Sequence, residues 1–372
     1  MKLFKLLAIT LFIALIVNCA KKEEVKTFEQ YEENGVKITK NNGIPADSTL
    51  ELNFNKVFTI STQEDSSLIM KNPGSINEDK DQNFYVLDSR THDVKKFNKL
   101  GQYQKTISRE GEGPGELKSP VVMFIDNDTL TVFSISSSKI SKFSLDGELY
   151  YDKAVDRISF NGSRMSPNGK NLVCYTLGML PDELVEFNMS LVDLLQFKVK
   201  SNISSIQFTM ADAMSGKFSP FDTVVPYCIG NENVYLSDGS DHQYKFFSHD
   251  FEGNKNGEIR KSYRQIRFSE SEQAELKKNT RKKDFEAPTN KDAIQDIYTD
   301  KYGRVLVIPG IDRNKDTEGK YIDIFKNGIF LNRVDYSKDS GVFWEKSGEL
   351  YFSGTRMYFV NSEDLSIDIY DY

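Results

Sequence analysis

Short runs of aromatic and β-branched residues recur along the chain, separated by polar turns. Residues 84–87 (FYVL) form one such run, residues 88–93 are polar, and apolar and polar side chains then alternate over 94–97 and 103–108. Aromatic and β-branched residues favour strands, and a period of two places alternate side chains on opposite faces of a sheet. This stretch therefore predicts consecutive antiparallel strands joined by tight turns.

The pattern of residues 83–120 returns in weaker copies as far as the C-terminus. Apolar runs that we interpret as inner strands lie at 83–87, 129–133, 171–175, 233–237, 304–308 and 349–353, and a second strand follows each of them. The step from Phe84 to Leu130 is 46 residues, and that from Val305 to Leu350 is 45 residues. Antiparallel sheets repeating at about 40–50 residues predict an all-β chain folded as a six-bladed β-propeller.

Residues 50–60 alternate strongly but have no partner strand close in sequence. A closed ring needs one blade that contains both ends of the chain, because closure removes exposed sheet edges. We therefore predict that this N-terminal strand pairs with residues 366–370 in the last blade.

One segment breaks the β pattern. Residues 269–272 (SESE) have the form of a capping box, and the residues after them favour helix. We predict one exposed helix on a blade-to-blade connection. Its basic end could contact anionic partners, or it could simply complement the helix macrodipole.

The N-terminus carries targeting signals. Residues 1–18 combine a basic start with a short apolar run at 6–17, which is typical of a signal peptide. Residues 16–19 (IVNC) resemble a bacterial lipobox. The resemblance implies cleavage after residue 18 and diacylation of Cys19, which would anchor the protein to a membrane. An uncleaved membrane anchor is the alternative, and it also leaves the domain outside the cytoplasm.

The residues that follow Cys19 indicate more closely where the protein is located. Ala20 resembles an outer-membrane sorting residue, with the domain facing the periplasm or the cell surface. Residues 22–24 (KEE) resemble a surface-export signal, although they also suit a solvated spacer. Residues 19–47 are rich in Lys, Glu, Asn and Gly and lack an apolar period. We expect a flexible tether there, with the propeller at 48–372.

The composition of the chain argues against nucleic-acid binding and bears on the state of its cysteines. The chain has 372 residues and a formal net charge of −7, which gives no electrostatic footprint for nucleic acid. Two cysteines remain beside Cys19, namely Cys174 and Cys228. We expect buried free thiols, and a disulfide in an oxidising compartment stays open as the alternative.

Motifs for common catalytic and metal sites are missing. No phosphate loop, HExxH or Gly-x-Ser-x-Gly motif is present. Residues 79–83 (DKDQN) imitate the start of a calcium loop, but Arg90 occupies the twelfth position, so we interpret them as a polar turn. We expect no cofactor and no metal. Trp344 is expected in the core between blades.

Candidate binding residues lie in two turns and one loop. His92 and His242 follow the predicted inner strands of blades 1 and 4, and we expect both, with His249, in solvated loops. A metal site would need a third ligand, such as Asp238. The loop at 109–116 (REGEGPGE) either presents charged side chains to a ligand or serves only as a glycine-rich crossing between blades. The candidate ligand-binding residues are Arg90, His92, Arg109, Glu110, Glu112, Asp238 and His242.

Residues 79–120 carry a family resemblance. The spacing Asp79-x-Asp-x-Asn-x-Tyr-Val-x-Asp88, then Val94-x-x-Phe97, then Gly111-Glu-Gly-Pro-Gly-Glu116, resembles six-bladed β-propeller lipoproteins of Bacteroidetes type, which are related to NHL-repeat proteins. Members of the wider class mostly bind proteins or glycans, and a minority are enzymes with a central metal.

The resemblance implies a lipid-anchored envelope module that binds a protein, peptide or glycan. The alternative is an extracytoplasmic hydrolase or lyase whose site lies at the mouth of the central channel.

Overall fold

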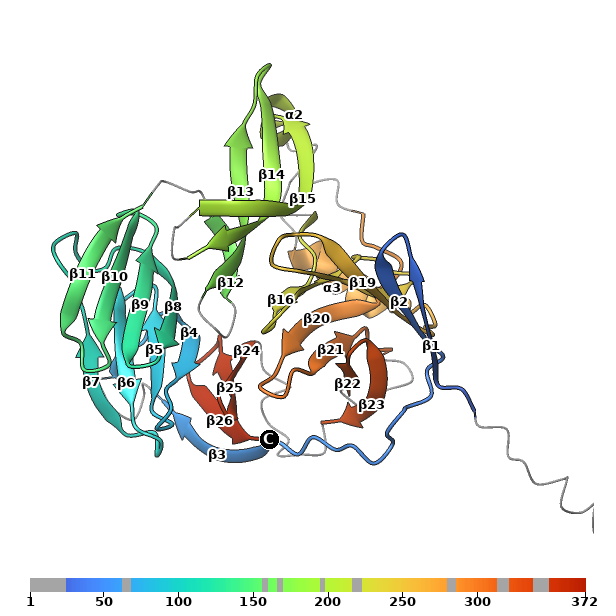
Figure 1. Cartoon of the computed structure of the whole chain (residues 1–372), viewed down its shortest axis with the longest axis horizontal. Helices are drawn as coiled ribbons and strands as arrows, with labels where there is room; N and C mark the ends of the chain where they lie inside the picture. The colour runs from blue at the N-terminus through green and yellow to red at the C-terminus, as the bar shows by residue number, and fades with distance from the viewer. Residues whose placement is uncertain are drawn as a thin grey trace, which may run out of the picture.

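A computed structural model describes residues 25–61, 68–155, 160–165, 170–194, 198–215, 223–279, 286–312, 321–336 and 348–372. Its strands form six sheets arranged in a ring (Figure 1). The chain is thus a six-bladed β-propeller, as the repeat pattern predicts. Cys19, residues 22–24 and Trp344 lie outside the described residues.

Each blade is built on four antiparallel strands, which follow chain order in all blades but the last, and two further strands join blade 4. Blade 1 is β4 (Pro73–Glu78), β5 (Phe84–Asp88), β6 (Asp93–Phe97) and β7 (Tyr103–Ile107); blade 2 is β8 (Pro120–Asp126), β9 (Thr129–Ser134), β10 (Lys139–Ser144) and β11 (Leu149–Ala154). Blade 3 is β12 (Phe160–Met165), β13 (Asn171–Met179), β14 (Leu184–Asp193) and β15 (Lys198–Thr209).

The second half of the ring repeats this order. Blade 4 is β16 (Tyr227–Ile229), β17 (Val234–Ser237), β18 (Tyr244–His249) and β19 (Lys255–Lys261); blade 5 is β20 (Ile294–Thr299), β21 (Val305–Pro309), β22 (Tyr321–Lys326) and β23 (Ile329–Asp335). Blade 6 is β24 (Gly348–Ser353), β25 (Arg356–Asn361), β26 (Ile367–Asp371) and β3 (Asn55–Ile60).

The apolar runs that we interpreted as inner strands are the second strands of blades 1 to 5, and only β24 is a first strand. The first strands, such as β4 and β8, lie nearest the centre of the ring (Figure 1). The second strand of a blade is more apolar than the first because neighbouring blades cover both of its faces. All five residues of β5 are buried, against two of six in β4.

Ring closure follows the prediction. β3 pairs antiparallel with β26, with Ile60 opposite Ile367 and Asn55 opposite Asp371. The N-terminal strand therefore completes the last blade. β3 begins at Asn55, and residues 51–54 before it are not part of the sheet.

The expected flexible tether at 19–47 is wrong for its middle part. β1 (Phe28–Glu33) and β2 (Val36–Asn41) form a hairpin, and β2 pairs in parallel with β19, extending blade 4 to six strands. Asn41 is 4% exposed and its side chain accepts a hydrogen bond from the Phe330 amide (2.8 Å) and donates to the Gly328 carbonyl (3.0 Å). Polar side chains dock this hairpin, so the apolar pattern could not reveal it.

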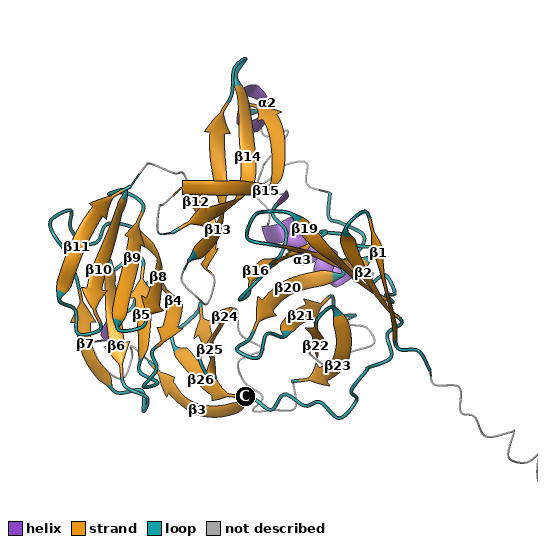
Figure 2. Ribbon diagram, viewed as in Figure 1, coloured by secondary structure: helices purple, strands orange, loops and turns teal. Residues whose placement is uncertain are grey.

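The described residues contain two helices, α2 and α3, where one was predicted (Figure 2). α3 (Glu270–Asn279) begins with the predicted capping box, in which the Ser269 amide donates to Glu272 (2.8 Å) and the Glu272 amide donates to Ser269 (3.3 Å). α2 (Met210–Met214) was not predicted and follows β15. In the ranges given above, neither helix is long and apolar enough to cross a bilayer.

Aromatic side chains fill the spaces between blades. The ring of Phe84 stacks on Phe97 within blade 1 at 5.1 Å and meets Tyr358 of blade 6 at 5.4 Å. Cys174 and Cys228 are both buried and form no disulfide, which confirms the interpretation as thiols.

Candidate functional site

The predicted binding residues share one end of the blades. The β5–β6 turn carries Arg90 and His92, and the loop between β7 and β8 carries Arg109, Glu110 and Glu112. Because adjacent strands are antiparallel, both connections lie at the same end of blade 1. We call this end of the ring the crossing face, since the chain passes from blade to blade there.

The crossing loop, residues 108–119, is held by a carboxylate inside it. Glu116 accepts hydrogen bonds from the Gly113 amide (2.9 Å) and from Arg109 Nε (2.9 Å). A Cβ at Gly111 would lie 2.0 Å from the Glu116 carboxylate, so only glycine fits at that position. These contacts fix the path of the loop.

Side chains of blade 2 also hold the crossing loop in place. Asp152 accepts from the Gly115 amide (2.9 Å) and pairs with Lys139 (3.0 Å), which also donates to the Gly113 carbonyl (2.9 Å). Burial acts to raise the pKa of Asp152, but the Gly115 amide and Lys139 hold that pKa below its ordinary value. The carboxylate is therefore ionised and bound at neutral pH.

The braced loop presents charged side chains to solvent. The side chains of Arg109, Glu110 and Glu112 are 82%, 69% and 66% exposed, and Glu112 is paired with Lys118. His92 Nδ1 lies 3.3 Å from Glu110 Oε1, without the geometry of a hydrogen bond. The loop is thus both a crossing between blades and a pre-organised charged surface.

The histidines differ in exposure. The His92 side chain is 17% exposed and that of His242 is 64% exposed, while His249 is buried at the end of β18. The expectation of three solvated loop histidines holds for His242 alone. His92 lies in the β5–β6 turn with a positive φ of 56°, and its side chain approaches Glu110 of the crossing loop.

In blade 4 the corresponding turn joins β17 to β18. The Asp238 carboxylate has its partners within this turn and β18: it pairs with Lys245 (3.0 Å) and accepts a hydrogen bond from the Ser240 amide (3.2 Å). Asp241 Oδ1 lies 2.9 Å from His242 Nδ1, and Ser240 Oγ lies 3.0 Å from the same nitrogen. A Ser-His-Asp relay needs the two partners on opposite ring nitrogens, so this trio does not form one.

Asp241 also ties the turn to the segment that contains α3. Its Oδ2 accepts from Asn290 (2.9 Å) and Gln265 (3.3 Å). The hydrogen bonds from His242 and then Asn290 lower the pKa of Asp241. The sequence could not reveal these partners, because residues 265 and 290 reach the turn only through the fold.

The two groups of predicted residues are not brought together. Those around His92 belong to blade 1, and Asp238 and His242 belong to blade 4, three blades away around the ring. Among the described residues there is no group of three or more His, Cys, Asp or Glu side chains that could hold a metal ion.

A second feature of the crossing face is an arm on blade 3. The outer ends of β13, β14 and β15, together with α2, stand out from the ring (Figures 1 and 2). We call residues 176–188 and 205–215 the blade-3 arm. Its tip carries the β13–β14 turn, the counterpart of the β5–β6 turn of blade 1.

The arm exposes large apolar side chains. Leu177, Met179 and Met214 are 46%, 68% and 82% exposed. Exposed apolar side chains on one projecting element can mark an interaction site, and methionine adapts its shape to irregular partners. The sequence did not reveal these exposed side chains. They are exposed because the arm extends past the neighbouring blades, which would otherwise cover them.

A family model agrees with the ring fold. A family model described as 6-bladed beta-propeller matches residues 26–306. No curated protein matches the chain. Among solved structures, a Bacteroides fragilis protein provisionally described as exported has 19% identity and a TM-score of 0.49, covering 89% of this chain and 97% of its own.

A second solved structure is similar at a lower level. It is a catalytically inactive virginiamycin B lyase of Staphylococcus aureus with quinupristin, with 10% identity and a TM-score of 0.41. The match covers 87% of this chain and 98% of that one.

Proposed function

We propose, from the premise that the chain belongs to the 6-bladed beta-propeller family, that it is a lipid-anchored binding module of the cell envelope. Its ligand is a protein, peptide or glycan that docks on the crossing face. The blade-3 arm favours a protein or peptide as the main partner.

The exposed apolar tip of the arm carries this proposal. Met179 and Met214 are 68% and 82% exposed, although burying such side chains is favourable by about 1.5–3 kcal/mol each. A partner that covers the tip gains this free energy.

The crossing loop supplies a second, polar surface on the crossing face. Arg109 is fixed by Glu116 while it remains 82% exposed, so little side-chain entropy is lost when a partner binds it. Charged groups of this kind set orientation and specificity around an apolar contact.

The partner test compares an arm variant with a matched control. In the test variant, Met179→Glu and Met214→Glu are combined. The control is Leu100→Glu, a 65% exposed residue in the β6–β7 turn at the opposite end of blade 1. Each protein is cross-linked in intact cells and its partners are quantified by mass spectrometry. We expect a partner that falls at least about tenfold with the arm variant alone. Identical partner sets for all three proteins would refute the proposal.

The anchoring part of the proposal rests on the lipobox resemblance at Cys19. Replacing Cys19 with Ala removes the thiol that would carry the lipid. Metabolic labelling with a palmitate analogue should mark the wild type and not the variant. Unlabelled wild type would contradict lipid anchoring without bearing on the partner site.

A further inference from the structure

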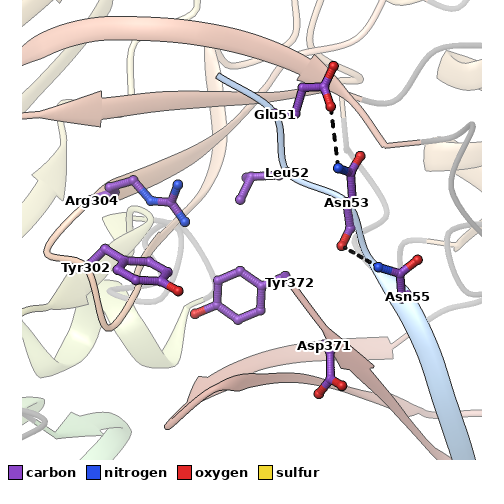
Figure 3. Close-up of a pocket in the computed structure, with 8 residues that line it drawn as sticks. All are labelled: Glu51, Leu52, Asn53, Asn55, Tyr302, Arg304, Asp371 and Tyr372. Carbon is purple, nitrogen blue, oxygen red and sulfur yellow. Dashed lines mark hydrogen bonds between the residues drawn. The ribbon is translucent and has the colours of Figure 1, made fainter. Parts of the chain in front are cut away.

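A pocket of about 420 Å³ lies where the two ends of the chain close the ring (Figure 3). Residues 51–55, leading into β3, form one wall. The others come from Tyr302 and Arg304 at the β20–β21 turn and from Asp371 and Tyr372 at the end of β26. The β20–β21 turn lies at the opposite end of the blades from the crossing face. The pocket is therefore separate from the surface proposed above.

One side of the pocket is aromatic. The Tyr302 ring is 52% exposed, and Figure 3 shows it beside the ring of Tyr372. Lys301 Nζ and Arg304 Cζ each lie 4.8 Å from the centroid of the Tyr302 ring. Both cations lie over the ring and hold it in place, so the part of Tyr302 that lines the pocket is a fixed contact surface.

The opposite side is lined by amides. Glu51, Asn53 and Asn55 point outward from an extended segment, while Leu52 and Phe54 between them are 3% and 1% exposed. Asn53 donates to Glu51 at 3.4 Å, and Asn55 donates to the Asn53 carbonyl at 3.5 Å. Hydrogen bonds of this length are weak. A ligand hydroxyl can replace them at little cost.

Two of the three charged side chains that line the pocket are paired within the protein. Arg304 Nε is bound by Asp300 at 2.5 Å, and the Asp300 side chain is fully buried. Asp371 is paired with Arg356 at 3.2 Å. The third, Glu51, is a carboxylate that repels anions, so the pocket favours a neutral ligand over a phosphate or a carboxylate.

From this geometry we infer that the pocket binds a neutral saccharide. A pyranose ring has a face of C–H groups that packs on an aromatic ring. Its hydroxyls both donate and accept, as do the Asn53 and Asn55 carboxamides facing them. The volume lies in the range of small-molecule sites. Because both chain ends contribute walls, a bound sugar also stabilises the closed ring.

The test uses saturation-transfer NMR on the full chain. The probes are glucose, galactose, mannose and their β-linked disaccharides at millimolar concentration, with glucuronate as the anionic counterpart. We expect saturation of pyranose C–H protons for at least one neutral sugar. Tyr302→Ala should abolish the signal, and Asn53→Ala should weaken binding about tenfold.

Tyr150→Ala is the matched control, since Tyr150 is a 55% exposed tyrosine in β11 of blade 2. It should leave the signal unchanged. Three results would overturn the inference: no transfer to any neutral sugar, an unchanged signal in both Tyr302→Ala and Asn53→Ala, or transfer to glucuronate alone. None of these results depends on the partner surface of the crossing face.

Discussion

At the scale of single residues, several polar positions have structural roles that their sequence pattern indicated. Asp79 Oδ1 accepts hydrogen bonds from the amides of Asp81 and Asn83, each at 2.9 Å. The calcium-like motif is therefore a polar turn, as interpreted. Asp300 makes the same contacts with the amides of Tyr302 and Arg304, each at 2.9 Å. This local chemistry is readable from sequence because it involves residues two and four positions apart.

His249 shows what sequence could not predict at this scale. Its side chain is buried beside Lys255, and its Nδ1 has no hydrogen-bond partner among the described residues. Burial, and then repulsion from Lys255, lowers its pKa. The folded state thus favours neutral histidine, so stability is present above the unfolded pKa of about 6.5 and is lost as pH falls below it.

We predict that His249→Gln removes part of this pH dependence. The wild type should lose more thermal stability than the variant between pH 7.5 and 5.5, because only the wild type must protonate a buried ring. Thermal unfolding followed by circular dichroism at both pH values measures this. His242→Gln, at an exposed position, is the control. Equal losses in wild type and His249→Gln would show that His249 does not contribute.

At the scale of elements, the strands, turns and α3 follow from local pattern, whereas the β1–β2 hairpin does not. β1 has no buried residue and β2 buries a threonine and an asparagine beside a single isoleucine. The hairpin is stable only because β19 offers it an open edge. A sequence scan that seeks alternating apolar residues cannot detect such docking.

The hairpin predicts a clear difference between two neighbouring asparagines. Asn41→Ala leaves the buried Phe330 amide without its acceptor, which costs about 1–3 kcal/mol. Asn42→Ala changes an exposed residue of the same type and should cost less. Urea denaturation of both variants gives the comparison. Similar midpoints for the two variants would mean that Asn41 does not anchor the hairpin.

At the scale of the whole molecule, a buried ionic cluster joins blades 4 and 5. Asp323 is 0% exposed, accepts from Tyr244 (2.8 Å), and pairs with Lys261 (2.8 Å) and Arg333 (2.7 Å). Burial acts to raise the pKa of Asp323, but Arg333 and Lys261 hold that pKa below its ordinary value. The stabilisation is therefore present above about pH 4 and is lost as pH falls through the lowered pKa.

Asp323→Asn should destabilise the ring by about 3–5 kcal/mol, because Lys261 would remain buried without a counter-charge. Urea denaturation at pH 7 measures the change. Asp128→Asn is the control: it breaks the exposed pair with Lys80 and should leave the midpoint unchanged. If both variants unfold at the wild-type midpoint, the cluster does not hold the two blades together.

The docked hairpin also changes how the proposed anchor would work. β1 is the outermost strand of the blade 4 sheet (Figure 1), and it begins nine residues after Cys19. Nine residues span at most about 30 Å. A lipid at Cys19 would therefore hold the rim of the propeller near the membrane, rather than on the long tether that composition alone suggested.

The sequence by itself determined the number of sheets, the closing strand pair, the polar turns and the capped helix. Each of these depends on periodicity or on contacts between residues close along the chain. The tertiary structure alone decided which strands face the axis, where the hairpin docks, that Met179 and Met214 are exposed, and that Asn53 faces Tyr302 across a pocket. Burial and long-range contact depend on which blades become neighbours, and no local pattern contains that information.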